Sequence, residues 1–171
     1  MAGVAPGHEI RPAGPEDVPT IAAIYNAGIR ERVATFETTE RTKEDVAEWL
    51  ESPLPLLVAV RDETIAGWAR VGRYSARPAY DGVGEHAVYV APNARGAGVA
   101  RDLLKALAGA AEEHGLHKLT SRVFTDNAPS RAAHRAAGFE EIGVHRRHAK
   151  LDGEWMDCVI VERLLGAATD A

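Results

Sequence analysis

A carboxylate and a glycine turn lie close together in the middle of the chain. Glu85 opens an apolar stretch that alternates with period two through 86–90, and a turn of small residues at 94–98 leads directly into a helical pattern. The first N–H groups of a helix lack partners within the helix, and the helix dipole is positive at that end. Such a turn attracts anions. The sequence therefore predicts an anion site, most simply for a diphosphate, with a carboxylate beside it.

The glycine turn does not match the two common nucleotide-binding loops. No Gly-Lys-Ser/Thr follows it, as a Walker loop requires, and the third glycine of a Rossmann fingerprint is missing. What remains is Arg95-x-x-Gly98-x-Ala100, between a strand and a long helix. This pattern resembles the pyrophosphate loop of the GNAT superfamily of N-acetyltransferases, which reads Arg/Gln-x-x-Gly-x-Gly/Ala. The alternative is that these glycines only form a tight turn between strand and helix.

The resemblance implies acetyl-CoA as co-substrate and no metal ion. We expect its pyrophosphate at 96–101 and its pantetheine arm beside the preceding strand, in the manner of an added strand. The expected cofactor-binding residues are Val88, Tyr89, Val90, Arg95, Gly96, Ala97, Gly98, Val99, Ala100, Arg101, Asn127 and Ser130.

Glu85 is the candidate general base. Period two places Glu85, Ala87 and Tyr89 on one face of the strand, and 86, 88 and 90 on the other. A carboxylate in a buried strand needs a reason, because an unpaired buried charge is costly. Acyl transfer to an amine requires removal of a proton from the ammonium, which a positioned carboxylate can do. An ion pair between Glu85 and a nearby arginine is the structural alternative.

A second candidate catalytic residue lies in the segment 127–139. In many members of the superfamily this segment reads Asn-x-x-Ser-x-x-x-Tyr-x-x-x-Gly-Phe, and the Tyr acts as general acid toward the departing thiolate. His134 stands at the Tyr position in this chain. Imidazole titrates near neutrality, so His134 is a candidate acid or base. Asn127 is expected to cap the helix or to bind the pantetheine, and packing of His134 against Phe139 is the alternative to catalysis.

His134 narrows the resemblance to one branch of the superfamily. The segments that resemble the phosphinothricin and methionine-sulfoximine N-acetyltransferases are Tyr25-Asn26, Phe36, Arg77-x-Ala79-Tyr80, Glu85-x-x-Val88-Tyr89-Val90, His134 and Gly153-x-Trp155-x-Asp157. Segments 32–38 and 145–148 are most similar to the arsinothricin N-acetyltransferases. The resemblance implies direct acetylation of the α-amino group of a glutamate mimic that bears a phosphinate, sulfoximine or arsinate, and hence resistance to such compounds. It also implies a homodimer.

Arginines in the loop before Glu85 agree with an acidic substrate, because the guanidinium fork binds carboxylate or phosphinate oxygens in pairs. The resemblance assigns substrate contacts to Phe36, Arg77, Tyr80 and Tyr89, and we infer Arg73 and Arg122 from the residues themselves. Arg77 as a solvated surface charge remains the alternative.

Two positions depart from the phosphinothricin enzymes, which have Lys and Thr where this chain has Ser75 and Ala87. The acceptor therefore stays open between a glutamate mimic and another primary amine, such as a polyamine, an aminoglycoside or a protein N-terminus. A protein that senses acyl-CoA without catalysis is a third possibility, which Glu85 and His134 argue against.

Two other signals are interpreted as structural. His145-x-x-His148 resembles a metal motif, but on a regular strand this spacing places the two rings on opposite faces. Cys158 has no activating base nearby in sequence, and direct transfer needs no covalent intermediate.

Composition is consistent with a single enzyme domain. A chain of 171 residues with a formal net charge of −5 disfavours a nucleic-acid binder. One cysteine excludes a disulfide framework, no apolar run reaches membrane-spanning length, and the first seven residues lack the features of a signal peptide. We therefore expect a cytoplasmic location.

The elements that must position these residues form one mixed α/β (α+β) domain over 8–165, with flexible tails at 1–7 and 166–171. Capping residues and periodicity predict the order β-α-α-β-β-β-α-β-α-β-β, with helices on both faces of a mixed sheet. The resemblance to the GNAT fold covers the same span. The expected strands are 8–12, 56–60, 65–71, 84–90, 116–124, 140–150 and 154–164, and the expected helices begin at 15 and 42 and cover 98–114 and 128–137.

Overall fold

One seven-stranded mixed sheet organises residues 7–170, which the structure, a computed structural model, describes. The strand order is β1-β2-β3-β4-β5-β7-β6, and β4 and β5 are the parallel neighbours within it. The strands are β1 (Glu9–Pro12), β2 (Leu56–Arg61), β3 (Thr64–Arg73), β4 (Val83–Val90), β5 (Lys118–Phe124), β6 (Glu140–Leu151) and β7 (Glu154–Leu164).

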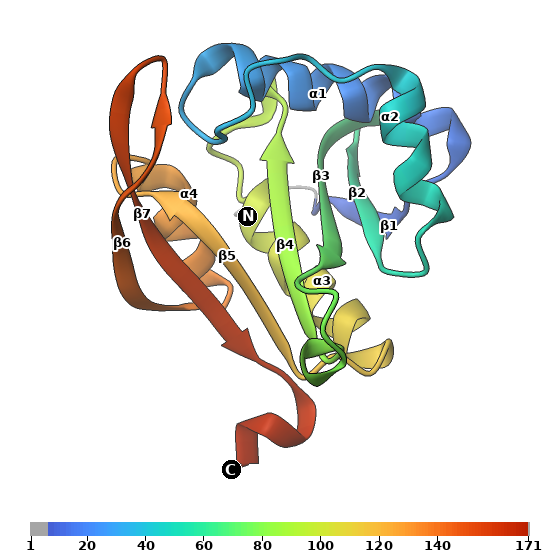
Figure 1. Cartoon of the computed structure of the whole chain (residues 1–171). Coiled ribbons are helices and arrows are strands. Elements are labelled where there is room, and N and C mark those ends of the chain that lie inside the picture. Colours follow the sequence, from blue (N-terminus) through green and yellow to red (C-terminus); the bar gives the residue numbers. More distant parts are fainter. Residues whose placement is uncertain (1–6, 171) are drawn as a thin grey trace, which may run out of the picture.

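Helices cover both faces of this sheet, as predicted (Figure 1). The helices are α1 (Val18–Glu31), α2 (Lys43–Ala47), α3 (Val99–Glu113) and α4 (Ala128–Ala136). Helices α1 and α2 pack on one face, and α3 and α4 on the other. The predicted element order and the mixed α/β class are confirmed, with most strand and helix ends within about two residues of those expected. The first helix is the exception: a 3-10 turn occupies Pro15–Asp17, and α1 begins at Val18.

The two faces of β4 carry different layers of the core. Ala87 and Tyr89 join the apolar cluster under α1 and α2, where Trp68 of β3 is fully buried. Val88 and Val90 join the cluster under α3, which contains Leu103 and its neighbours. The predicted alternation along β4 is therefore confirmed, and Glu85 lies on the α1 and α2 side.

The neighbouring strands β4 and β5 are paired along only part of their length. Their parallel pairing runs only from Val83 with Lys118 to Glu85 with Thr120, whereas β4 continues to Val90 and β5 to Phe124. On its other side β5 pairs with β7 along its whole length, from Lys118 to Phe124. Within the described residues, the edge of β4 that faces β5 is therefore left unpaired from 86 to 90, and it opens as a V whose apex is at Glu85.

The C-terminal end of the chain differs from the expected tail. Residues 1–6 of the expected N-terminal tail, and Ala171 of the C-terminal tail, lie outside the described residues. Gly166–Asp170 form a short 3-10 helix after the buried Leu165. No helix in the described part of the chain is both long and apolar enough to cross a membrane.

Candidate active site

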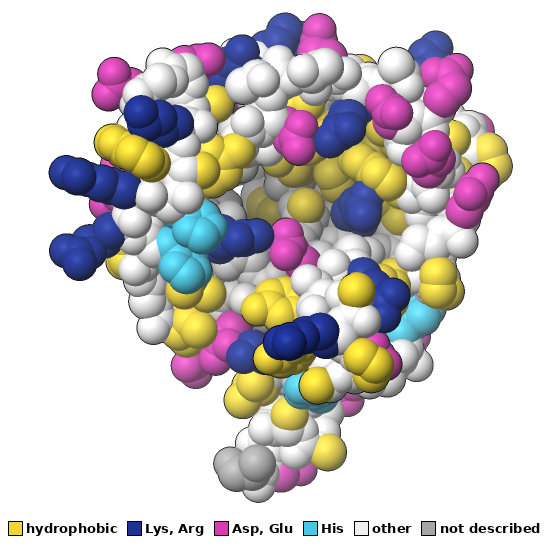
Figure 2. Space-filling view, viewed as in Figure 1, with side chains coloured by type: hydrophobic (Ala, Val, Ile, Leu, Met, Phe, Trp, Pro, Cys, Tyr) yellow, Lys and Arg dark blue, Asp and Glu magenta, His cyan; other side chains and the backbone are white. Residues whose placement is uncertain are grey.

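Glu85 lies in a pocket on the α1 and α2 face of the sheet. The pocket has a volume of about 260 Å³, and the Glu85 side chain is 43% exposed. Figure 2 shows the hollow in this face, with acidic and basic side chains at its walls. The lining residues are Tyr25, Trp49, Trp68, Arg70, Gly72, Arg73, Glu85, His86, Ala87 and Tyr89.

The Glu85 carboxylate has one cationic neighbour, Arg122 of β5. Its Oε1 lies 3.6 Å from Arg122 Nη2, and Arg122 Nη1 in turn donates to His148 Nε2 at 3.0 Å. Arg122 and Glu85 are both nearly half-exposed, so this pair is loose and contributes little to stability. The structural alternative for Glu85, an ion pair, is thus present as a weak contact that leaves the carboxylate open to the pocket.

Aromatic rings form the deep wall of the pocket. Tyr89 stacks on Trp68 with ring centroids 5.0 Å apart, and Tyr25 meets Tyr89 edge-on at 5.0 Å. Gly28 of α1 permits this packing, because a Cβ there would stand 2.9 Å from the Tyr89 ring. Burial raises the pKa of Tyr89 above its ordinary value, so its phenol stays protonated. Tyr89 is therefore a fixed, neutral wall of the site.

Of the other predicted substrate residues, Arg73 lines the pocket but is tied to its own loop. Its Nε donates to the carbonyl of Ser75 at 2.9 Å, and Nη2 to that of Ala76 at 3.3 Å. Arg77 and Tyr80 are exposed and do not line the pocket. The loop therefore places its arginines at the rim, and substrate contact by them would require their side chains to turn inward.

Phe36 does not line the pocket either. Its ring packs edge-on against Phe124 at 4.9 Å, in an apolar cluster with Leu151 and Cys158. The thiol of Cys158 is buried, and burial raises its pKa, which disfavours the nucleophilic thiolate. This cluster joins the loop before α2 to strands β5 and β7.

The glycine loop, residues 95–101, presents the start of α3 to solvent. Gly96 and Gly98 have φ of 80° and 79°, a left-handed conformation that favours glycine. Gly98 is the N-cap of α3, and no side chain among the described residues caps the helix there. The N–H groups of the first turn are therefore available to an anion. Arg95 and Arg101 flank them, bound to Glu31 at 3.0 Å and Asp102 at 2.8 Å.

Asn127 acts as a cap, one of the two predicted roles. Its side-chain oxygen accepts a hydrogen bond from the backbone N–H of Ser130 at 3.2 Å, at the start of α4. Its Nδ2 donates to the carbonyl of Val33 at 3.2 Å, which ties the loop after α1 to this helix. Both ends of the amide are thus engaged within the protein.

His134 is buried against β4 and pairs with a second buried histidine. Its Nε2 lies 3.0 Å from Nε2 of His86, and its Nδ1 lies 2.7 Å from the carbonyl oxygen of Ser130. Both rings pack on Phe139, so the packing alternative for His134 is realised together with the hydrogen bond. Burial lowers the pKa of both imidazoles, and in His86 the neighbouring His134 lowers it further. Both rings are therefore neutral near pH 7.

Glu85 and His134 approach β4 from opposite faces of the sheet. Glu85 points into the pocket under α1 and α2, whereas His86, the next residue, points toward α4 and His134. They flank β4 beside the apex of the V, where the pairing of β4 with β5 stops at Glu85 and Thr120. A group placed in the V could be reached from both sides.

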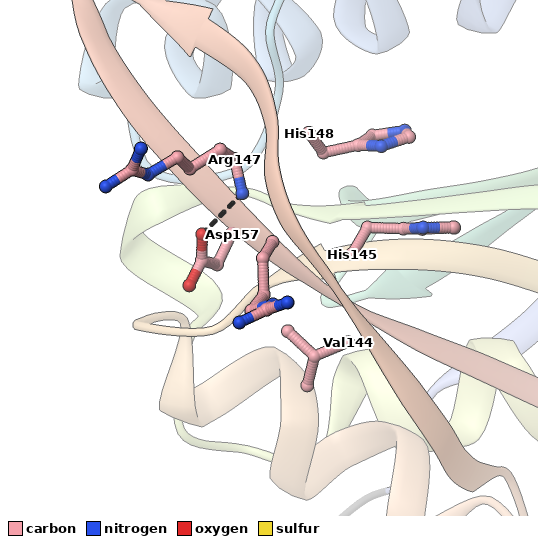
Figure 3. Close-up of a pocket in the computed structure, with 6 residues that line it drawn as sticks. Val144, His145, Arg147, His148 and Asp157 are labelled. Carbon is pink, nitrogen blue, oxygen red and sulfur yellow. Dashed lines mark hydrogen bonds between the residues drawn. The ribbon is translucent and has the colours of Figure 1, made fainter.

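The prediction that His145 and His148 lie on opposite faces is wrong. Their rings stack with centroids 4.4 Å apart, because β6 contains a bulge between His145 and Ala149 in which Arg147 adopts a φ of 48°. Asp157 of β7 accepts a hydrogen bond from the Arg147 N–H at 2.7 Å and holds the bulge (Figure 3). Over residues 7–170, no third His, Cys, Asp or Glu completes a metal-binding group.

Sequence reasoning missed two side chains of the site. Arg70 lines the pocket, and His86 is the partner of His134. The signal for Arg70 was a charge inside the otherwise apolar strand 65–71, at the parity of the buried Trp68. The signal for His86 was similar, since it shares the parity of Val88 and Val90 in β4.

The mixed sheet splits beside a carboxylate and has a glycine loop at the mouth of the split, an arrangement suited to holding a diphosphate next to a base. The acetyltransferase (GNAT) family model matches residues 21–139, and the chain belongs to this family. It is an N-acetyltransferase.

The chain is similar to N-acetyltransferases whose names give amino-acid analogues as substrates. The chain is 35% identical to the phosphinothricin N-acetyltransferase of Alcaligenes faecalis, over 92% of this chain and 83% of the relative. It is 32% identical to the L-methionine sulfoximine/L-methionine sulfone acetyltransferase of Pseudomonas paraeruginosa, over 90% and 92%. The solved phosphinothricin acetyltransferase of Sinorhizobium meliloti, in complex with AcCoA, superposes with a TM-score of 0.90 at 28% identity, over 97% and 92%.

Proposed function

We propose that this enzyme transfers the acetyl group of acetyl-CoA to the α-amino group of a glutamate-like amino acid that bears a phosphinate, sulfoximine or arsinate. Arsinothricin, phosphinothricin and methionine sulfoximine are the proposed acceptors, and the transfer would confer resistance to them. The observation that carries the proposal is the position of Glu85, a half-exposed carboxylate at the apex of the V between β4 and β5. Relatives that act on phosphinothricin and methionine sulfoximine support the choice of acceptor.

In this proposal the acetyl-CoA pyrophosphate binds the glycine loop. The uncapped first turn of α3 supplies backbone N–H groups, and Arg95 and Arg101 add positive charge at its edges. The pantetheine arm then lies along the unpaired edge of β4 at Val88–Val90 and completes the sheet as an added strand would. This path leads from the loop to Glu85.

The proposed reaction is a direct transfer in one complex. Glu85 removes a proton from the ammonium of the acceptor, and the free amine attacks the thioester carbonyl. The new C–N bond forms as the carbonyl oxygen gains negative charge, which a backbone N–H near Val90 stabilises. The C–S bond then breaks as the nitrogen of the new amide loses its second proton, and the CoA thiolate takes up a proton.

His134 is proposed as the acid on the far side of the sheet, together with His86. Both ring nitrogens of His134 are engaged, one by Ser130 and one by His86. A proton for the thiolate must therefore come from the hydrogen bond between the two rings, where His86 Nε2 carries it and passes it to His134 Nε2, so the pair acts as a unit. His134 could equally share the base role with Glu85, and the pH dependence of turnover separates the two roles.

The charge of the site favours an acidic acceptor over a polycation. Arg70 and Arg73 line the pocket, and Arg122 contacts Glu85 from β5. Positive charges around the base repel a polyamine or an aminoglycoside and attract carboxylate or phosphinate oxygens. The proposal therefore places amino-acid analogues first among primary amines.

A thiol-release assay with a small panel of amines tests the function. We expect CoA release with arsinothricin, phosphinothricin or methionine sulfoximine, and much lower kcat/KM with spermidine, an aminoglycoside and a short peptide with a free N-terminus. Turnover confined to the last three compounds would overturn the proposed acceptor class. Binding of acetyl-CoA without turnover of any amine would instead indicate a sensor.

We further propose that the enzyme is a cytoplasmic homodimer. The hairpin of β6 and β7 supports a dimer, since it exposes Ile142, Val144 and Trp155 by half or more of their surface at the edge of the sheet. The free thiol of Cys158 is consistent with a reducing compartment. Light scattering coupled to size-exclusion chromatography tests the dimer, and a monomer at all concentrations would contradict it.

A further inference from the structure

Arg70 of β3 stands beside Glu85 on the same face of the sheet. In the antiparallel pairing of β3 with β4, Arg70 lies opposite Ala87, and Gly72 lies opposite Glu85. Residues that pair directly point to one face, and so do residues two apart along a strand. Arg70 and Glu85 are therefore diagonal neighbours in the pocket floor, and Gly72 between them carries no side chain.

Two contacts fix where the guanidinium of Arg70 lies. Its Cζ is 4.3 Å from the centroid of the Trp49 ring, in a cation–π contact. A Cβ built on Gly72 would stand 3.2 Å from Arg70 Nη2, so this nitrogen lies over Gly72. The positive charge is thus held above the residue that pairs with Glu85, beside the proposed base.

The Arg70 guanidinium has no anion of its own. Throughout residues 7–170, it makes no hydrogen bond and no ion pair, while the nearby Glu85 is paired with Arg122. The side chain is half-buried, and burial lowers the pKa of the guanidinium, although it remains charged. Removal of a charge from water without a paired anion is costly. A conventional pair in the same protein, Arg11 with Asp17, has two hydrogen bonds of 2.7 and 3.0 Å.

We propose that Arg70 is the oxyanion-binding residue of the acceptor site, where it holds a carboxylate or phosphinate of the amino-acid substrate and thereby sets the amine against Glu85. The inference rests on the proposed function and adds a residue to it. An α-carboxylate is separated from the amine by a single carbon, so a cation beside the base suits that group. The side-chain phosphinate offers the same chemistry, and the experiment distinguishes the two.

Kinetics of an Arg70→Met variant test the proposal. We expect the KM for phosphinothricin to rise by about ten- to hundredfold, the effect of losing a hydrogen-bonded charge, while the KM for acetyl-CoA stays the same. Arg70→Lys keeps the charge without the fork and should fall between Arg70→Met and the wild type. Arg61→Met at the end of β2, where Arg61 lies 3.9 Å from Asp62, is the matched control and should match the wild type.

Methionine sulfoximine identifies the bound group, because its side chain is neutral and its α-carboxylate is charged. An equal rise in KM for both substrates assigns Arg70 to the α-carboxylate, and a rise for phosphinothricin alone assigns it to the phosphinate. An unchanged KM for both would overturn the proposal and leave Arg70 as a support for Trp49 alone.

A binding measurement separates this inference from the proposed function. Trp49 and Trp68 line the pocket, so their fluorescence reports on an anion beside Arg70. Glutarate has two carboxylates and no amine, and it should change the fluorescence of the wild type and of Arg61→Met but not of Arg70→Met. The absence of a response in the wild type, or an equal response in Arg70→Met, would overturn the oxyanion site whatever amine the enzyme acetylates.

Discussion

Nε2 of His86 and Nε2 of His134 lie 3.0 Å apart in the interior of the protein, although the two residues come from β4 and α4. The direction of this hydrogen bond follows from the other nitrogen of His134. Its Nδ1 lies 2.7 Å from the Ser130 carbonyl oxygen and must therefore carry a proton. In the neutral ring Nε2 is then the acceptor, and His86 donates to it. The pair thus connects β4, the strand that carries Glu85, to α4 through a single hydrogen bond.

This buried pair predicts that stability falls in mild acid. The folded-state pKa values of both rings lie below the ordinary value of 6.5, so the unfolded chain binds more protons. The free energy of unfolding should be highest above about pH 6.5 and should fall as the pH drops below it toward the folded-state values. Urea denaturation at several pH values between about 7.5 and 5 measures this slope.

A His86→Leu variant provides the comparison for that experiment. It removes one of the two groups that take up a proton on unfolding, so its free energy of unfolding should fall less steeply with acid than that of the wild type. Identical slopes in the two proteins would show that the pair is not the source of the acid sensitivity.

Glu85→Gln tests the base. The amide has nearly the same shape as the carboxylate but cannot accept a proton from an ammonium, so kcat should fall by about 10²-fold or more at neutral pH. The KM for acetyl-CoA should be unchanged. Steady-state thiol release measures both, and the exposed Glu51→Gln at the end of the 3-10 helix after α2 serves as the control. Full turnover by Glu85→Gln would remove Glu85 from the mechanism.

A double-mutant cycle tests whether His134 and His86 act as a unit. His134→Phe should lower kcat by about ten- to hundredfold, and His86→Leu should lower it less, because His86 acts through His134. The double variant should be no slower than His134→Phe alone, because the loss of His86 has no further effect once His134 is absent. The pH profile of kcat should lose the same limb in all three variants, a change that a general loss of packing would not produce. Additive losses would instead indicate two independent structural roles.

Much of this architecture could be predicted from the sequence because it depends on local signals. The side chain of Thr42 accepts a hydrogen bond from the Asp45 N–H at 3.1 Å and starts α2, as its position before an acidic turn predicts. The hairpin at Asp152 and Gly153 has φ of 48° and 84°, which the Asp-Gly pair predicts. Alternation in β4 correctly assigned the faces of Glu85 and Tyr89.

The features that could not be predicted depend on contacts between distant segments. The bulge at His145–His148 breaks period two, and its stabilising partner Asp157 comes from the neighbouring strand. The V between β4 and β5 is present because their pairing stops at Glu85 and Thr120, whereas the pairing of β5 with β7 continues to Phe124. Arg73 donates hydrogen bonds to carbonyl oxygens of its own loop. These bonds depend on the path of the loop, which residue spacing does not predict.

Substitutions at two glycines of α3, Gly98 at its N-cap and Gly109 in its interior, should have opposite effects. Gly98 has a φ of 79° at the N-cap of α3, so Gly98→Glu strains the backbone and places a negative charge at the proposed pyrophosphate site. Acetyl-CoA binding, measured by titration calorimetry, should weaken by at least about tenfold. Arg95→Ala should weaken it less, because Arg95 is at the exposed edge of the loop.

Gly109 in the interior of α3 is the matched control. A Cβ built there meets no atom within 4 Å, and alanine is the better helix former. Gly109→Ala should therefore bind acetyl-CoA like the wild type and raise the free energy of unfolding by about 0.5–1 kcal/mol. Unchanged affinity in a folded Gly98→Glu variant would show that the pyrophosphate binds elsewhere, because the start of α3 would then tolerate both strain and negative charge.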